Sequence, residues 1–163
     1  MSKRYSAPPA LTIDSNKNYT ATISTQKGDI KLQLLPKEAP NTVNSFVFLA
    51  REGYYDGLTF HRVEDWVLQG GDPTGTGSGG PGYNLKAEFN ATKHAEGTLA
   101  MARTSDPHSA GSQFYIVKRD AFWLDNQYTV FGQTIEGMDV VKKLARGDVM
   151  TKVTIEETEA TTK

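Results

Sequence analysis

Four short segments concentrate aromatic, glutamine and arginine residues close to the ends of predicted strands. They are residues 60–62, 66–72, 113–115 and 123–124. Arginine stays protonated and presents a fixed fork of donors, so a guanidinium such as that of Arg62 suits electrostatic stabilisation of a polar group. By residue type alone, a surface arginine beside alternating core residues also explains these segments. The pattern of all four segments therefore matters more than any single residue.

Chemistry that depends on metals or on thiol nucleophiles finds little support. The histidines His61, His94 and His108 lie in separate segments, with no i,i+4 pair and no acidic residue at ligand spacing. The sequence contains no cysteine, which removes disulfides, thiolate nucleophiles and cysteine-based metal sites. It also lacks the G-x-S-x-G elbow of many hydrolases. We expect neither a metal nor a cofactor.

A glycine-rich segment, residues 70–82, contains the letters of a dinucleotide-binding fingerprint at Gly75, Gly77 and Gly80. That motif must open a helix, so that the pyrophosphate meets the helix N-terminus. Here Pro81-Gly82 follows at once. We therefore expect a turn-rich surface loop instead of a nucleotide site.

Composition restricts the class of protein. The 163 residues fit one domain, and 18 Lys plus Arg against 19 Asp plus Glu give a formal charge of −1, which disfavours nucleic acid as the main partner. No apolar run resembles a secretory signal or a membrane span. The absence of cysteine suits a reducing cytoplasm, and no segment suggests an extra interface. We expect a cytoplasmic monomer with no membrane partner.

The order of predicted elements indicates an all-β fold. Residues 1–18 lack a clear period and are expected to form an extended N-terminal segment, with the domain occupying residues 19–163. Alternation predicts a β-hairpin over 19–34, and a 3.6-residue period predicts helices over 40–52 and 138–145. Further strands are predicted at residues 58–63, 66–69, 98–103, 113–117, 129–134 and 153–157. Without βαβ alternation, this order favours a closed eight-stranded antiparallel barrel capped by two α-helices.

Longer sequence words resemble one known family. They are FHRV and LQGGDP within residues 60–73, GTLAMAR at 97–103, GSQFYI at 111–116 and WLDNQYTVFG at 123–132. In this order they are similar to the cyclophilin family of peptidyl-prolyl cis-trans isomerases, over about residues 20–157. The resemblance implies a closed eight-stranded barrel with two capping helices and an active site on its outer face. It also implies isomerisation of X-Pro bonds in proline-containing peptides and folding proteins.

The resemblance assigns roles residue by residue. Arg62 resembles the catalytic arginine of the family, and Gln69 the glutamine that holds it and the substrate backbone. Further positions resemble those that contact the peptide, line the proline pocket or bind the inhibitor cyclosporin. The peptide contacts are Gln113, Ala102 and Arg103, the pocket residues are Tyr115, Val67, Leu124 and Trp66, the cyclosporin-associated residue is Trp123, and Tyr128 takes a position often held by histidine.

The sequence departs from the family pattern near the pocket. The segment between Arg62 and Gln69 is one residue shorter than is common, so Trp66 either stays in the pocket or turns its indole outward. Tyr115 replaces a usual phenylalanine, and Val67 a frequent methionine. These departures leave a second function open, a proline-peptide-binding or chaperone module that turns over slowly or not at all.

Overall fold

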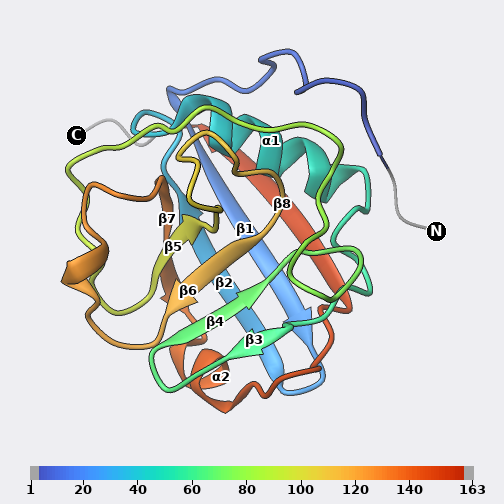
Figure 1. Ribbon diagram of the computed structural model, residues 1–163, viewed down its shortest axis with the longest axis vertical. Coiled ribbons are helices and arrows are strands. Elements are labelled where there is room, and N and C mark those ends of the chain that lie inside the picture. Colours follow the sequence, from blue (N-terminus) through green and yellow to red (C-terminus); the bar gives the residue numbers. More distant parts are fainter. Residues whose placement is uncertain (1–3, 160–163) are drawn as a thin grey trace.

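The computed structural model describes residues 4–159, and eight antiparallel strands form one sheet (Figure 1). The strands are β1 (Lys17–Thr25), β2 (Gly28–Leu34), β3 (Arg62–Val63), β4 (Val67–Gly70), β5 (Thr98–Met101), β6 (Phe114–Val117), β7 (Val130–Glu136) and β8 (Lys152–Glu159). The helices are α1 (Pro40–Arg51), α2 (Met138–Lys143) and the 3₁₀-helix η1 (Phe122–Leu124). Figure 1 shows α1 and α2 at opposite ends of the sheet.

The sheet is not a closed barrel, and the prediction of closure was wrong. The strand order is β3-β4-β6-β5-β7-β2-β1-β8, so β3 and β8 are unpaired edges. Closure would need a ladder between these two strands, but β3 is only two residues long. The predicted strand over residues 58–63 is mostly irregular, and it meets residues 147–150 through one isolated bridge, Thr59 with Val149, and a few backbone hydrogen bonds. The amide of Phe60, for example, donates to the carbonyl of Asp148 at 2.9 Å.

Alternation along the strands separates two apolar clusters, one on each face of the sheet. The main core contains Leu68 of β4 and Phe114 of β6, together with the α1 residue Phe46. The neighbours of these strand residues, Val67 and Tyr115, belong to a smaller cluster on the other face. That second face carries the candidate site.

The N-terminal segment lies beside α1 (Figure 1). The buried amide of Asn44 accepts hydrogen bonds from the backbone N–H groups of Thr12, at 3.0 Å, and Ile13, and donates to the carbonyl of Ala10 at 3.0 Å. These bonds hold an irregular segment against a helix. The division between this segment and the domain at residue 18 stays a prediction.

Among residues 4–159, none of the helices has the length and apolar character that crossing a bilayer requires.

The N-terminus of α1 receives its cap from a distant residue. Ala39 makes no side-chain cap, and Pro40 brings no N–H group. The carboxylate of Glu88 instead accepts the N–H groups of Asn41 at 3.1 Å and Thr42 at 2.8 Å. This contact joins α1 to the long loop that precedes β5.

We expect Glu88→Ala to lower the free energy of unfolding by about 1–2 kcal/mol, because it removes both the cap and a favourable charge at the helix N-terminus. Urea unfolding followed by circular dichroism measures the change. Glu38→Ala is the matched control, since Glu38 is an exposed acid in the turn before α1. Equal effects of the two substitutions would mean that the cap bonds contribute nothing beyond charge.

Candidate active site

A small cavity of about 110 Å³ lies on the second face of the sheet. Nine of the eleven residues assigned from the sequence line it, and the other two, Gln113 and Trp123, lie just outside. The lining residues are Arg62, Trp66, Val67, Gln69, Ala102, Arg103, Tyr115, Leu124 and Tyr128.

Strand register places several of these residues in one row. Arg62 of β3 pairs with Gln69 of β4, and Gln69 pairs with Tyr115 of β6. Tyr115 in turn pairs with Ala100 of β5. Since directly paired residues point to the same face, one cross-strand row carries a cation, an amide, a phenol and a methyl group. The row explains why residues far apart in the sequence share one cavity.

The hydrogen bonds along this face form one chain, in which each side chain donates to the next group. Nη1 of Arg62 donates to Oε1 of Gln69 at 3.3 Å, and Nε2 of Gln69 donates to Oε1 of Gln113 at 3.3 Å. Nε2 of Gln113 then donates to the carbonyls of Gly77 and Gly79 at 2.9 and 3.0 Å. Because a guanidinium only donates, it fixes the orientation of both amides.

The glycine-rich loop is itself held by a buried carboxylate. Asp72 accepts hydrogen bonds from the backbone N–H groups of Thr74, Thr76 and Gly77, and from the Thr74 hydroxyl. Burial disfavours the charged form of Asp72, but these donors outweigh burial and lower the pKa of the carboxyl group. The loop therefore presents the two carbonyls that Gln113 needs.

Arg62 has two further partners in the short turn between β3 and β4. Its Nε donates to the carboxylate of Glu64 at 2.6 Å, and its guanidinium lies 5.5 Å from the centre of the Trp66 ring. Glu64 was not among the site residues predicted from the sequence. The Arg62 side chain is 45% exposed, so this ion pair is screened by solvent.

The shorter turn leaves the Trp66 indole at the cavity. The N–H of Glu64 donates to the carbonyl of Val67 at 2.9 Å, which closes a turn with Asp65 and Trp66 at its tip. The Trp66 ring then packs edge-on against Trp123 at 5.3 Å between centroids. Of the two orientations that the sequence left open, the structure has the one that lines the cavity.

A buried histidine explains how tyrosine fits at the floor of the cavity. Asp125 accepts both the backbone N–H of His94 at 2.8 Å and its Nδ1 at 3.0 Å. A carboxylate only accepts, so Nδ1 carries the proton and Nε2 accepts the Tyr115 hydroxyl at 2.9 Å. The hydroxyl is bonded to the buried histidine, and the ring remains part of the cavity lining.

Burial sets the titration of this trio. It lowers the pKa of His94 and raises that of Tyr115, since both charged forms lose solvation. Burial opposes charge on Asp125 too, but the bonds from His94 lower its pKa. Sequence reasoning found neither His94 nor Asp125, because they are 31 residues apart; the one available signal was a tyrosine hydroxyl that needed a partner.

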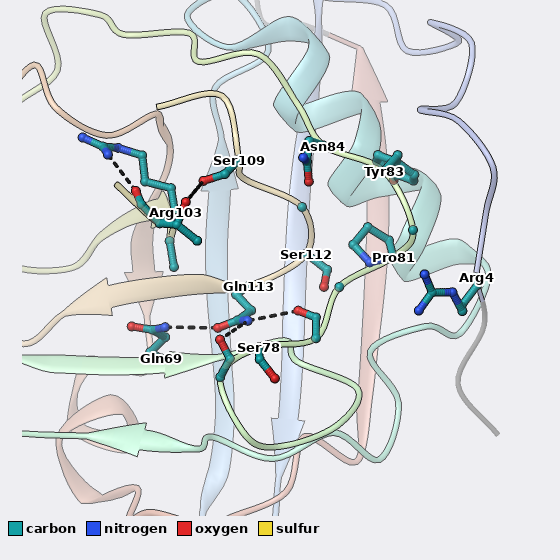
Figure 2. Close-up of a pocket in the computed structure, with 17 residues that line it drawn as sticks. Arg4, Gln69, Ser78, Pro81, Tyr83, Asn84, Arg103, Ser109, Ser112 and Gln113 are labelled. Atoms are coloured by element: carbon teal, nitrogen blue, oxygen red, sulfur yellow. Dashed lines mark hydrogen bonds between the residues drawn. The ribbon is translucent and has the colours of Figure 1, made fainter. Parts of the chain in front are cut away.

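A second, larger cavity of about 710 Å³ adjoins the first (Figure 2). The two cavities share Gln69, Ala102 and Arg103. Gln113 lies in the larger one, together with most of the glycine-rich loop. A bound peptide could therefore extend from one cavity into the other.

The lowered pKa of His94 predicts a loss of stability in mild acid. The unfolded chain takes up the proton near the ordinary histidine value of 6.5, before the folded protein does. The contribution of neutral His94 to stability should therefore be complete above that pH. The free energy of unfolding should fall as the pH drops below it. Urea unfolding at about pH 7.5 and about pH 5 measures this fall.

His94→Asn should reduce the fall without abolishing it, because burial also lowers the pKa of His61. His108→Asn supplies a matched loss of an exposed imidazole. Asp125 loses its charge only at lower pH, because its pKa lies below the ordinary aspartate value of 3.8. Its protonation therefore does not contribute between the two pH values of this experiment. An unchanged fall in His94→Asn would contradict the assignment.

Comparison with known proteins agrees with this architecture. Residues 20–160 match the family model described as cyclophilin type peptidyl-prolyl cis-trans isomerase/CLD. A peptidyl-prolyl cis-trans isomerase of Helicobacter pylori is 46% identical over 142 residues, covering 84% of this chain and 86% of the relative. One from Synechococcus elongatus is 47% identical over 138 residues, covering 83% and 94%.

A solved structure is similar in fold. The crystal structure of a cyclophilin type isomerase from Cryptosporidium parvum, obtained in the presence of the dipeptide Ala-Pro, has a TM-score of 0.78 and 30% identity. The match covers 84% of this chain and 98% of that one. With the family model matching most of the chain, and relatives above 40% identity at this coverage, the chain belongs to the cyclophilin-type peptidyl-prolyl cis-trans isomerases.

Proposed function

We propose that the small cavity binds the proline ring of X-Pro segments in peptides and folding proteins, and that Arg62 accelerates rotation about the preceding bond. The observation that carries this proposal is the guanidinium at the edge of a cavity with apolar walls. The dipeptide Ala-Pro present with the Cryptosporidium parvum relative supports the same class of substrate.

The chemistry requires no nucleophile. Resonance places the nitrogen lone pair in the C–N bond and creates a rotation barrier of roughly 18–20 kcal/mol. In the twisted transition state the lone pair returns to the prolyl nitrogen. A donor aimed at that nitrogen binds the transition state more strongly than the planar ground state, which is what catalysis requires.

Arg62 is positioned for this work by its partners. Two of its five N–H groups bond to Glu64 and Gln69 in the structure, so the guanidinium is held from two sides. The remaining N–H groups supply the donor for the prolyl nitrogen. Gln69 and Gln113 keep the guanidinium in place and offer polar groups to the substrate backbone.

The walls of the cavity hold the ring while the rest of the peptide rotates. Val67 and Tyr115 are almost fully buried, and Leu124 and Trp66 pack against the same cluster. An apolar site also excludes water. Water would stabilise the planar, charge-separated amide, so its exclusion favours rotation. Uncatalysed exchange takes about 10–100 s, so turnover near 10³ per second needs about 7 kcal/mol of transition-state stabilisation.

A second candidate function is peptide binding with slow turnover. The Glu64 carboxylate, 2.6 Å from Nε of Arg62, favours it because the ion pair must share the guanidinium with the substrate. The exposure of both groups weakens that competition. We therefore rank catalysis first. We also expect that the protein is a monomer and that it acts in the cytoplasm.

Arg62→Ala should slow isomerisation of an Ala-Pro peptide by about 100-fold or more, because it removes the donor to the prolyl nitrogen. Exchange measured by NMR gives the rate, and circular dichroism checks the fold. Arg51→Ala is the matched control, since Arg51 lies on α1 and lines neither cavity. Near wild-type turnover in Arg62→Ala would remove the assigned role, whereas slow turnover in the unaltered protein would favour the binding module.

Trp123→Ala should weaken cyclosporin binding much more than it slows catalysis. Trp123 is 56% exposed and lies outside the small cavity, where its indole offers apolar surface to a large ligand. Calorimetric titration with cyclosporin and peptide exchange measure the two effects. Equal losses would mean that Trp123 shapes the cavity through its contact with Trp66.

A further inference from the structure

The larger cavity carries a charge pattern that the proposed function does not use. Its walls contain two arginines, Arg4 and Arg103, and no aspartate or glutamate among the described residues. The nearby carboxylate of Asp72 is buried behind the glycine-rich loop, where N–H groups of that loop occupy its oxygens. All charged side chains in the lining of this cavity are therefore cationic.

The two arginines differ in what their guanidinium groups contact. Arg103 donates to the carbonyls of Gln127 and Thr104 at 2.8 and 2.9 Å, and it lies over the Tyr128 ring at 4.6 Å. Figure 2 shows its guanidinium turned away from the larger cavity and that of Arg4 turned toward it. Within residues 4–159 no carboxylate forms an ion pair with Arg4.

The residue after Arg4 anchors it. The backbone N–H of Tyr5 donates to the carbonyl of Pro81 at 2.8 Å, and the Tyr5 ring packs edge-on against Phe48 at 5.1 Å between centroids. Gly82 allows this approach, because a Cβ there would collide with the Tyr5 carbonyl oxygen. Arg4 is thus held at one end of the cavity by contacts on both the loop and α1.

Arg4 and Tyr5 lie outside the family match, which begins at residue 20. The cationic end of the cavity therefore comes from the N-terminal segment, whereas the proline cavity comes from the matched domain. Because the cavities share Gln69, Ala102 and Arg103, a peptide with its proline in the smaller one can place a nearby side chain in the larger one.

We propose that the larger cavity selects substrates with an acidic side chain within a few residues of the proline, and that Arg4 is the specificity-determining residue. The proposal rests on the proposed function, since it assumes a proline in the smaller cavity. Arg4 is exposed, and exposed ion pairs are weak, so the preference is expected to be about three- to fivefold.

The test uses an otherwise neutral parent peptide with one Ala-Pro bond, in which Glu, Gln or Lys is placed at one position at a time on either side of the proline. NMR exchange at several peptide concentrations gives kcat/KM for each. We expect at least one position where Glu exceeds Gln about three- to fivefold and Lys falls below Gln. The preference should shrink when ionic strength rises from about 0.02 M to about 0.5 M, because salt screens exposed charges.

Three variants assign the preference. Arg4→Glu should abolish or reverse the preference for Glu over Gln in kcat/KM. Tyr5→Ala should reduce this preference, although the charge of Arg4 is kept. Lys37→Glu is the matched control, since Lys37 is an exposed cation that lines neither cavity, and it should keep the wild-type ratio.

The outcomes separate the two proposals. Turnover of these peptides without a Glu preference at any position would overturn the role of Arg4 and leave the isomerase intact. A ratio that is unchanged in Arg4→Glu would do the same. No turnover of any peptide would instead overturn the proposed function.

Discussion

A guanidinium can donate hydrogen bonds but never accept them, and this constraint orders the whole candidate site. Arg62 forces the oxygen of Gln69 toward itself, so the nitrogen of Gln69 must find an acceptor in Gln113. Gln113 then needs carbonyls, which the glycine-rich loop supplies. The loop can offer them because Asp72 holds its N–H groups from behind. This chain of hydrogen bonds thus starts at the cation of Arg62 and ends at a loop held by the anion of Asp72, with two neutral amides between them.

The floor of the small cavity follows a different rule. A phenol in an apolar wall is costly unless its hydroxyl finds a partner. His94 provides that partner, and Asp125, which directly follows the wall residue Leu124, fixes the tautomer of His94. Floor and wall are therefore joined by a buried polar network, although neither presents that network to a ligand.

Much of this arrangement could be predicted from the sequence, because its longer words resemble the cyclophilin family and that resemblance carries the site residues over one by one. Val67, Gln69, Gln113 and Tyr115 were assigned to one site, and the structure brings them together around two adjoining cavities. Contacts set by distant parts of the chain were missed. Glu88 caps α1 from 46 residues away, and the trio of Tyr115, His94 and Asp125 has no local pattern. Closure of the sheet was wrongly predicted because strand length, which is two residues for β3, depends on how the neighbouring loop packs.

The pairing of β1 with β8 has a consequence for how the chain acquires this structure. The first strand lies between β2 and the last strand, with eight residue pairs joining Lys17–Ser24 to Lys152–Glu159. On a ribosome, β1 can form its hairpin with β2 early, but its other edge stays open until the residues of β8 have been made. An open strand edge invites pairing with other chains, and contacts this distant in sequence form slowly. The sheet of this isomerase is thus complete only after β8, more than 120 residues beyond β1, has joined it.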